Sequence, residues 1–199
     1  MEFNKSQTKS NLARAYTGEC LDGARYQWIA KQAVADGFSY ISDLFKMLAK
    51  NEMAHARVFY DHLIKNSKDE LSNIDVCAGY PFDDYQLESA FKNAASAELS
   101  ESKNIYPAFA KVARDEGYPD IADSFELVAM VEECHFKQIS QINEQYEKNK
   151  LYSCKEETKW KCSNCGHEHA AKNAWKNCSL CSYPQGYVML QLDDNWLIK

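Results

Sequence analysis

The stretch Asn51-Glu52-Met53-Ala54-His55 decides the fold, because it places two ligand-type side chains in the middle of an apolar helical pattern. Apolar side chains recur every three or four residues between about residues 38 and 65, which is the spacing of one buried helix face. Glu52 and His55 fill the gap in that face, one turn apart. A buried carboxylate is costly unless a positive group meets it. The stretch therefore predicts a cation inside the protein.

Three other segments repeat this pattern of acid inside an apolar helix face. Their acids include Glu19, Glu98 and Glu132, and His135 follows Glu132 by one turn. A Glu from each of two helices plus Glu-x-x-His from the other two is the ligand set of a carboxylate-bridged dimetal centre in a four-helix bundle. Oxygen and imidazole ligands suit iron or manganese. The three segments span about residues 12–33, 87–112 and 121–146.

The spacing of the acids also predicts that they share one height in the bundle. Glu52 follows Glu19 by 33 residues, and Glu132 follows Glu98 by 34. With a bend about midway, each pair of helices folds back so that its two glutamates meet. We expect one helical hairpin used twice about an approximate two-fold axis, joined by a long connection at about residues 66–84. Pro107 should kink the third helix.

The C-terminal part carries a second metal pattern. Two Cys-x-x-Cys pairs are separated by twelve residues. Each pair directs two thiolates at one point, and two pairs close a tetrahedral site of four sulfurs. A module of about 40 residues has too little core to fold without its metal. The spacing itself suits either iron or zinc. The four cysteines are Cys162, Cys165, Cys178 and Cys181.

Composition narrows the class of protein and its surroundings. A formal net charge of −6 argues against a nucleic-acid partner. No apolar run is long enough for a membrane span, and the first residues lack the apolar core of a secretory signal. The remaining cysteines are scattered singly, so we expect a reducing cytoplasm rather than a disulfide scaffold. No role is assigned to Cys20, Cys77, Cys134 or Cys154.

The order of these motifs resembles rubrerythrin over nearly the whole chain. The strings at residues 17–19, 51–56, 105–107, 131–135 and 160–162 also agree. The resemblance implies an all-α, ferritin-like four-helix bundle over residues 1–150. It further implies a small rubredoxin-like domain with an FeS₄ site over residues 155–199. Ser179 and Ser182 depart from the Pro and Gly common in rubredoxins, which weakens the case for iron over zinc there.

The resemblance also implies a reaction, a ligand set and partners. Rubrerythrins are non-haem peroxidases in which the FeS₄ site feeds electrons to a di-iron centre that reduces hydrogen peroxide to water. The electrons would come from NAD(P)H through a separate oxidoreductase or a rubredoxin, within a head-to-tail homodimer or a larger homo-oligomer. The implied di-iron ligands are Glu19, Glu52, His55, Glu98, Glu101, Glu132 and His135.

The resemblance also implies details for Glu101, Tyr26 and Tyr106. In the family, one iron exchanges the carboxylate at the Glu101 position for the histidine at the His55 position on reduction. Glu101 is one carboxylate more than the minimal ligand set, and such a surplus ligand gives a metal somewhere to move. Tyr26 and Tyr106 are expected near the metals, where each either hydrogen-bonds a ligand carboxylate or serves as a core aromatic.

Two other functions stay open on the sequence. A ferroxidase that oxidises iron for storage would use the same bundle, although storage needs no electron inlet such as the four-cysteine module. A non-catalytic metal-binding or sensing protein would hold zinc in both sites. A visible spectrum separates these possibilities, because ferric iron bound by four sulfurs is coloured and zinc is silent.

Overall fold

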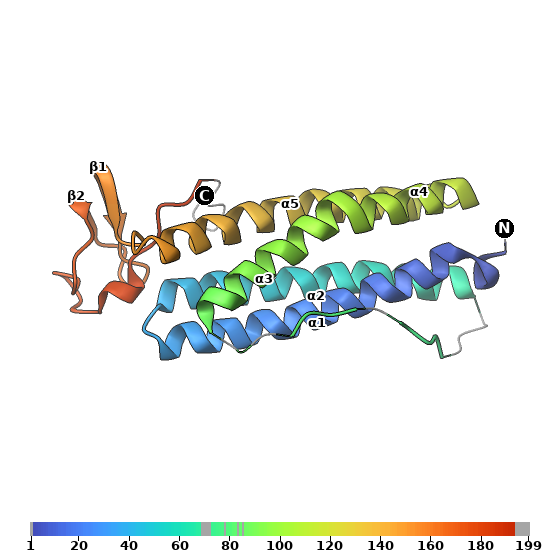
Figure 1. Ribbon diagram of the computed structural model, residues 1–199, viewed down its shortest axis with the longest axis horizontal. Coiled ribbons are helices and arrows are strands. Elements are labelled where there is room, and N and C mark those ends of the chain that lie inside the picture. Colours follow the sequence, from blue (N-terminus) through green and yellow to red (C-terminus); the bar gives the residue numbers. More distant parts are fainter. Residues whose placement is uncertain (1, 69–72, 78, 83, 85, 194–199) are drawn as a thin grey trace.

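The structure is a computed structural model of the 199-residue chain, and it describes residues 2–68, 73–77, 79–82, 84 and 86–193. Long helices lie side by side along the longest axis, and a small module with two strands sits at one end (Figure 1). The helical elements are η1 Phe3–Lys5, α1 Gln7–Ala35, α2 Ser39–Ser67, α3 Leu87–Ser100, η2 Glu101–Ile105, α4 Tyr106–Glu116, α5 Pro119–Glu147 and η3 Gln185–Tyr187. The strands are β1 Ser153–Lys161 and β2 Glu168–Asn173.

The two predicted hairpins are present, and each turns at a glycine. Gly37 (φ +85°) joins α1 to α2, and Gly117 (φ +91°) joins α4 to α5. Both φ values lie in the left-handed region that glycine reaches without steric cost. The carboxylate of Glu116 accepts the N–H groups of Gln7 and Thr8 at 2.9 and 2.8 Å. Together with Ser6, whose hydroxyl accepts the N–H of Lys9 at 3.1 Å, it caps the first turn of α1.

The third helical stretch is interrupted earlier than Pro107 alone predicts. α3 ends at Ser100, the π-helical turn η2 follows, and α4 continues the rod in a changed direction (Figure 1). The N–H of Tyr106 donates to the Glu101 carbonyl five residues back. Pro107 has no N–H to give, so the regular ladder cannot continue through it. The irregular turn therefore begins at Glu101.

Two apolar clusters leave a layer of acids between them. Phe45 stacks on Phe91 with ring centroids 5.4 Å apart in one cluster, and Phe59 lies 5.0 Å from Phe125 in the other. Along α1, α2, the third stretch and α5, the residues of one cluster precede the buried glutamate and those of the other follow it. Both clusters keep water away from the layer, which strengthens electrostatic interactions inside it.

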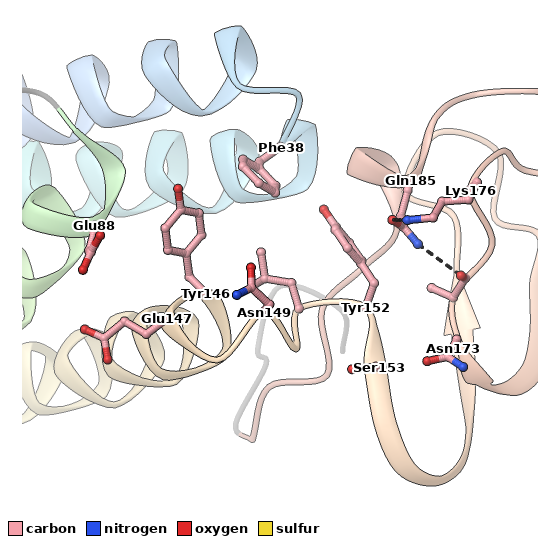
Figure 2. A pocket seen from close by; sticks show the side chains of 12 residues that line it. Phe38, Glu88, Tyr146, Glu147, Asn149, Tyr152, Ser153, Asn173, Lys176 and Gln185 are labelled. Carbon is pink, nitrogen blue, oxygen red and sulfur yellow. Dashed lines mark hydrogen bonds between the residues drawn. The ribbon is translucent and has the colours of Figure 1, made fainter.

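The C-terminal module has a core of its own and docks against the end of the helices. Trp160 is fully buried with Val188 and Ala174. Gly186 approaches the turn at Gly37 so closely that a Cβ on it would lie 1.7 Å from the Gly37 carbonyl oxygen. A crevice of about 630 Å³ remains beside this contact, lined by aromatic and polar side chains of both parts (Figure 2). The predicted domain boundary at residues 150–155 stays a prediction.

None of the helices in the described residues is both long and apolar enough to cross a membrane.

Candidate metal centres

Four helices bring their acids together in two overlapping groups. Within each group, one ligand-type atom per residue lies within 4.8 Å of the others. Glu52 and Glu132 belong to both groups, so they occupy the positions of bridging carboxylates. The acids are at most 2% exposed. One group is Glu19, Glu52, His55 and Glu132, and the other is Glu52, Glu98, Glu132 and His135.

The two histidines present the same ring nitrogen to the shared acids. His55 Nδ1 lies 2.9 Å from a Glu132 oxygen and 3.0 Å from a Glu52 oxygen. His135 Nδ1 lies 2.7 Å from Glu132 and 3.1 Å from Glu52. The rings are stacked with centroids 5.8 Å apart. Nδ1 is therefore the nitrogen that would ligate a metal in each group.

The electrostatics of the layer call for added positive charge. Burial raises the pKa of Glu19 and of Glu98 well above the usual range, and neighbouring carboxylates add to the rise. Burial opposes ionisation of Glu132, but its close contacts with His135 and His55 lower its pKa to about 2. Burial also disfavours charge on His55, yet Glu132, Glu19 and Glu52 raise its pKa to about 12. Without a metal, protons must neutralise these acids.

Buried polar atoms that lack a hydrogen-bond partner show whether a metal fits between these side chains. Among the described residues, both Glu132 oxygens, Glu52 Oε1, Glu98 Oε2 and His135 Nδ1 are buried without a hydrogen bond of good geometry. Buried polar atoms normally have partners, and an ion that accepts several oxygen and nitrogen ligands supplies them. Two glutamates shared between two Glu–His sets are the donor set of a dimetal centre. The residues present fit that group.

Both predicted tyrosines touch an acid of the opposite hairpin. The Tyr26 hydroxyl on α1 donates to Glu98, and the Tyr106 hydroxyl on α4 donates to Glu19. Both rings are at most 1% exposed. Each tyrosine thus holds one of the two unshared glutamates in place. Their part in the chemistry stays a prediction.

Glu101 stands apart from the two groups. It opens the π turn, is half-buried, and is absent from both ligand groups of the described residues. Burial, Asp22 and Glu98 raise its pKa well above the usual range. The structure therefore places it beside the centre rather than in it, and the predicted ligand role stays open.

Sequence reasoning did not assign a role to Asn51, although it belongs to the stretch that decides the fold. Its side-chain amide lies 3.3 Å from His135 Nε2, joining α2 to α5. A partner at Nε2 orients the ring and selects the tautomer that leaves Nδ1 free to ligate. The available signal was its position directly before Glu52.

A buried ion pair next to the centre was also missed. Arg25 donates to Asp22, and both are 4% exposed. Burial raises the pKa of Asp22 to about 6 although Arg25 pulls it down. The Tyr80 hydroxyl donates to Asp22 at 3.2 Å, and the guanidinium lies 5.0 Å from the Tyr80 ring centroid. The signal was an acid and a base one turn apart between Glu19 and Tyr26.

The four cysteines converge as their spacing predicts. Each Sγ lies within 4.8 Å of the others, with Cys162 3.8 Å from Cys181 and Cys165 3.7 Å from Cys178. Four sulfurs at this spacing fit a tetrahedral metal site. His167 Nε2 lies 3.0 Å from the Ser179 hydroxyl, so it links the two Cys-x-x-Cys turns, which we call the cysteine knuckles. The other four cysteines form no disulfide.

Comparison with known proteins decides the family. The family model described as rubrerythrin matches residues 10–80 and 89–168. The chain belongs to the rubrerythrin family. The rubrerythrin of Clostridium perfringens is 34% identical over 185 residues, covering 92% of this chain and 93% of that protein. The rubrerythrin of Nitratidesulfovibrio vulgaris is 33% identical over 192 residues, covering 96% and 97%.

Solved structures confirm the fold of this rubrerythrin-family chain. Nigerythrin in a partially reduced state has a TM-score of 0.61 at 22% identity, covering 96% of this chain and 94% of that one. An open pore ferritin from Archaeoglobus fulgidus has a TM-score of 0.58 at 16% identity, covering 74% and 88%. The predicted ferritin-like bundle with a C-terminal cysteine knuckle is confirmed. The two carboxylate–histidine groups and the four-cysteine cluster fit rubrerythrin-type iron centres.

Proposed function

We propose that this protein reduces hydrogen peroxide to water at a di-iron centre, with electrons entering through an FeS₄ site on the four cysteines. The observation that carries the proposal is the pair of buried Glu–His groups that share Glu52 and Glu132. When bound there, two irons supply the two electrons that cleavage of the oxygen–oxygen bond requires. Hydrogen peroxide, two electrons and two protons give two water molecules.

The residues around the centre position the ligands, hold a proton and exclude water. Glu52 and Glu132 hold the two halves at one height, and the Nδ1 atoms of both histidines face them. The tyrosine hydroxyls fix the two unshared glutamates. Glu101, whose pKa is raised by burial and by neighbouring acids, can hold a proton on its carboxylate beside the centre. The aromatic clusters on both sides exclude water.

The docking of the C-terminal module supports electron transfer between two chains. Ser163 in the first cysteine knuckle donates to the Tyr187 carbonyl in η3 at 2.8 Å, and η3 packs against Gly37. Along α2, Ser39 and Glu52 are thirteen residues apart, which is about 20 Å at a rise of about 1.5 Å per residue. The cysteine site thus lies beyond the far end of its own bundle. A head-to-tail homodimer would bring it close to the partner's centre, with an NAD(P)H-linked oxidoreductase or a rubredoxin as the donor.

Cys178→Ser tests the electron inlet. The variant should lose turnover with an external enzymatic reductant, because one thiolate of the cysteine site is gone. Its bundle, reduced chemically and freed of reductant, should still be oxidised by hydrogen peroxide as fast as the wild type. The four remaining non-knuckle cysteines offer a control, since Cys77→Ser should change neither reaction. Full enzymatic turnover by Cys178→Ser would refute the inlet, and a wild-type reduced centre that ignores peroxide would refute the peroxidase.

A further inference from the structure

A cavity of about 340 Å³ lies beside the candidate di-iron centre, although no member of the two carboxylate–histidine groups lines it. Its walls come from α1, α3, η2, α4 and the connection at residues 79–81. Two of its residues adjoin the centre: Glu101, and Tyr106, which donates to Glu19. One water takes about 30 Å³ of liquid volume, so the cavity has room for a molecule well above the size of hydrogen peroxide. Pro81, Ile105 and Phe109 give it an apolar side.

Gly18 forms the part of the wall that faces Glu101. It lies within the 29-residue helix α1, where a glycine lowers helix stability relative to alanine. No left-handed φ requires it there. Outside its own helix, a Cβ at Gly18 would have one atom within 4 Å, the Glu101 Oε1 at 3.8 Å. The absent side chain thus leaves open space directly in front of that carboxylate.

We infer that Gly18 sets the size of substrate that this cavity admits, and that the cavity admits organic hydroperoxides as well as hydrogen peroxide. The inference rests on the proposed peroxidase function. An organic hydroperoxide takes two electrons from the reduced centre and two protons, its oxygen–oxygen bond breaks, and an alcohol and water leave. The alkyl group would lie against the apolar side, with the hydroperoxyl group at the Gly18–Glu101 end. A side chain at Gly18 would take up space at that end and leave less room for a bulky peroxide.

The test compares Gly18→Ala and Gly18→Val with the wild type and with Gly23→Ala. Gly23 lies on the same helix, and a Cβ there would meet the flexible Met53 side chain at 3.2 Å, which is not in the cavity wall. Full-length iron-loaded protein is reduced with dithionite, freed of it, and mixed with hydrogen peroxide, tert-butyl hydroperoxide or cumene hydroperoxide. The rate at which the oxidised spectrum returns is measured by stopped flow.

The wild type and Gly23→Ala should react with all three peroxides. Gly18→Ala should lose about tenfold in rate with the organic hydroperoxides and less than about twofold with hydrogen peroxide, since one methyl group in a pocket discriminates by about this much. Gly18→Val should lose more. An unchanged ratio of the rates, or a wild type that reacts with hydrogen peroxide alone, would overturn the inference and leave the proposed function standing. A wild type inert to every peroxide would remove both.

Two further measurements separate blocked access from damage. Gly18→Ala in metal-free protein should raise the urea midpoint of unfolding, because alanine is the better helix former. The affinity of the oxidised centre for azide, followed by its absorption band, should stay within about twofold of the wild type if access by small anions is unaffected. A lower urea midpoint, or azide affinity that falls as far as the organic hydroperoxide rate, would assign the loss to a damaged centre and overturn the inference.

Discussion

The two helical hairpins supply equivalent halves of one centre, yet only the first is regular. α1 and α2 are unbroken helices of 29 residues each, whereas the second hairpin passes through a π turn before α4. Glu19 and Glu98 are the unshared acids, and each is held by a tyrosine of the other hairpin. The symmetry of the ligands therefore survives a difference in the backbone.

The spacing between each tyrosine and the unshared glutamate on its own hairpin shows how the ligands keep equivalent positions although the backbone differs. Tyr26 follows Glu19 by seven residues, or two helical turns, while Tyr106 follows Glu98 by eight. The π turn absorbs the extra residue, because its hydrogen bonds span five residues instead of four. Both tyrosines thus reach equivalent places. The inserted residue changes the helix at the point where Glu101 stands.

The acids one turn beyond each unshared glutamate differ in their surroundings. Asp22 follows Glu19 by three residues and is paired with Arg25. Glu101 follows Glu98 by three residues, and its pKa is raised mainly by burial and by four neighbouring carboxylates. The first hairpin has neutralised its extra acid, and the second has left it available to a metal or a proton.

The largest expected difference is in the iron content of two variants, one without a shared glutamate and one without an unshared glutamate. Glu52→Ala removes a ligand of both groups, so we expect iron in the helical part to be lost altogether, while Glu98→Ala should lose about half. The four-cysteine site should keep its spectrum in both variants. Iron per chain by elemental analysis checks this. Equal losses in the two variants would contradict the assignment of Glu52 as a bridge.

Substitutions that act on Asp22 and on Glu101 should change the stability of the metal-free protein in opposite directions. Arg25→Met strands Asp22 without its cation and should cost about 1–2 kcal/mol near pH 7, because protonation of Asp22, whose pKa is about 6, limits the loss. Glu101→Gln should stabilise, because the raised pKa of Glu101 means that its ionised form opposes folding. Urea denaturation at several pH values measures both effects.

The pH dependence of these two variants gives the sign check. The loss in Arg25→Met should shrink as the pH falls through about 6, the pKa of Asp22 in the folded protein, because the acid is then protonated in the folded state with or without its cation. The gain in Glu101→Gln should appear as pH rises above 4.5, the usual Glu pKa, and vanish below it. A gain that is constant with pH would mean that the side-chain shape, not the charge, is responsible.

The smallest contrast concerns the two tyrosines. Tyr26→Phe and Tyr106→Phe each remove one hydroxyl that donates to an unshared glutamate, so each should lower the free energy of unfolding by about 1.5–3 kcal/mol. Because the contacts are equivalent, the two losses should agree within error. Urea denaturation of metal-free protein compares them. A marked difference would show that the π turn leaves the second hairpin less well fitted than the first.

Sequence reasoning found what depends on periodicity. The four helices, the layer of Glu19, Glu52, Glu98 and Glu132, and the convergence of the cysteines follow from helical spacing and from the geometry of Cys-x-x-Cys turns. The π turn could not be found, because any residue can take its dihedral angles and Pro107 marks only its end. The position of Glu101 was therefore predicted for a regular helix.

The partners of the ligands were harder to predict than the ligands. Asn51 meets His135 across the bundle, and this contact depends on the rotation of α2 against α5 rather than on a local spacing. Arg25 could have been noticed as a cation on a buried stripe beside Asp22. Tyr26 was expected to meet either a ligand carboxylate or only other core side chains, and the packing of α1 against α3 gives it the carboxylate of Glu98.

The contact between Gly186 and the Gly37 carbonyl leaves no thickness for even a methyl group between the module and the bundle. A mutation to any other amino acid at residue 186 would push the module away from the turn between α1 and α2. The orientation of the four-cysteine module against the helices thus depends on one codon that encodes no side chain.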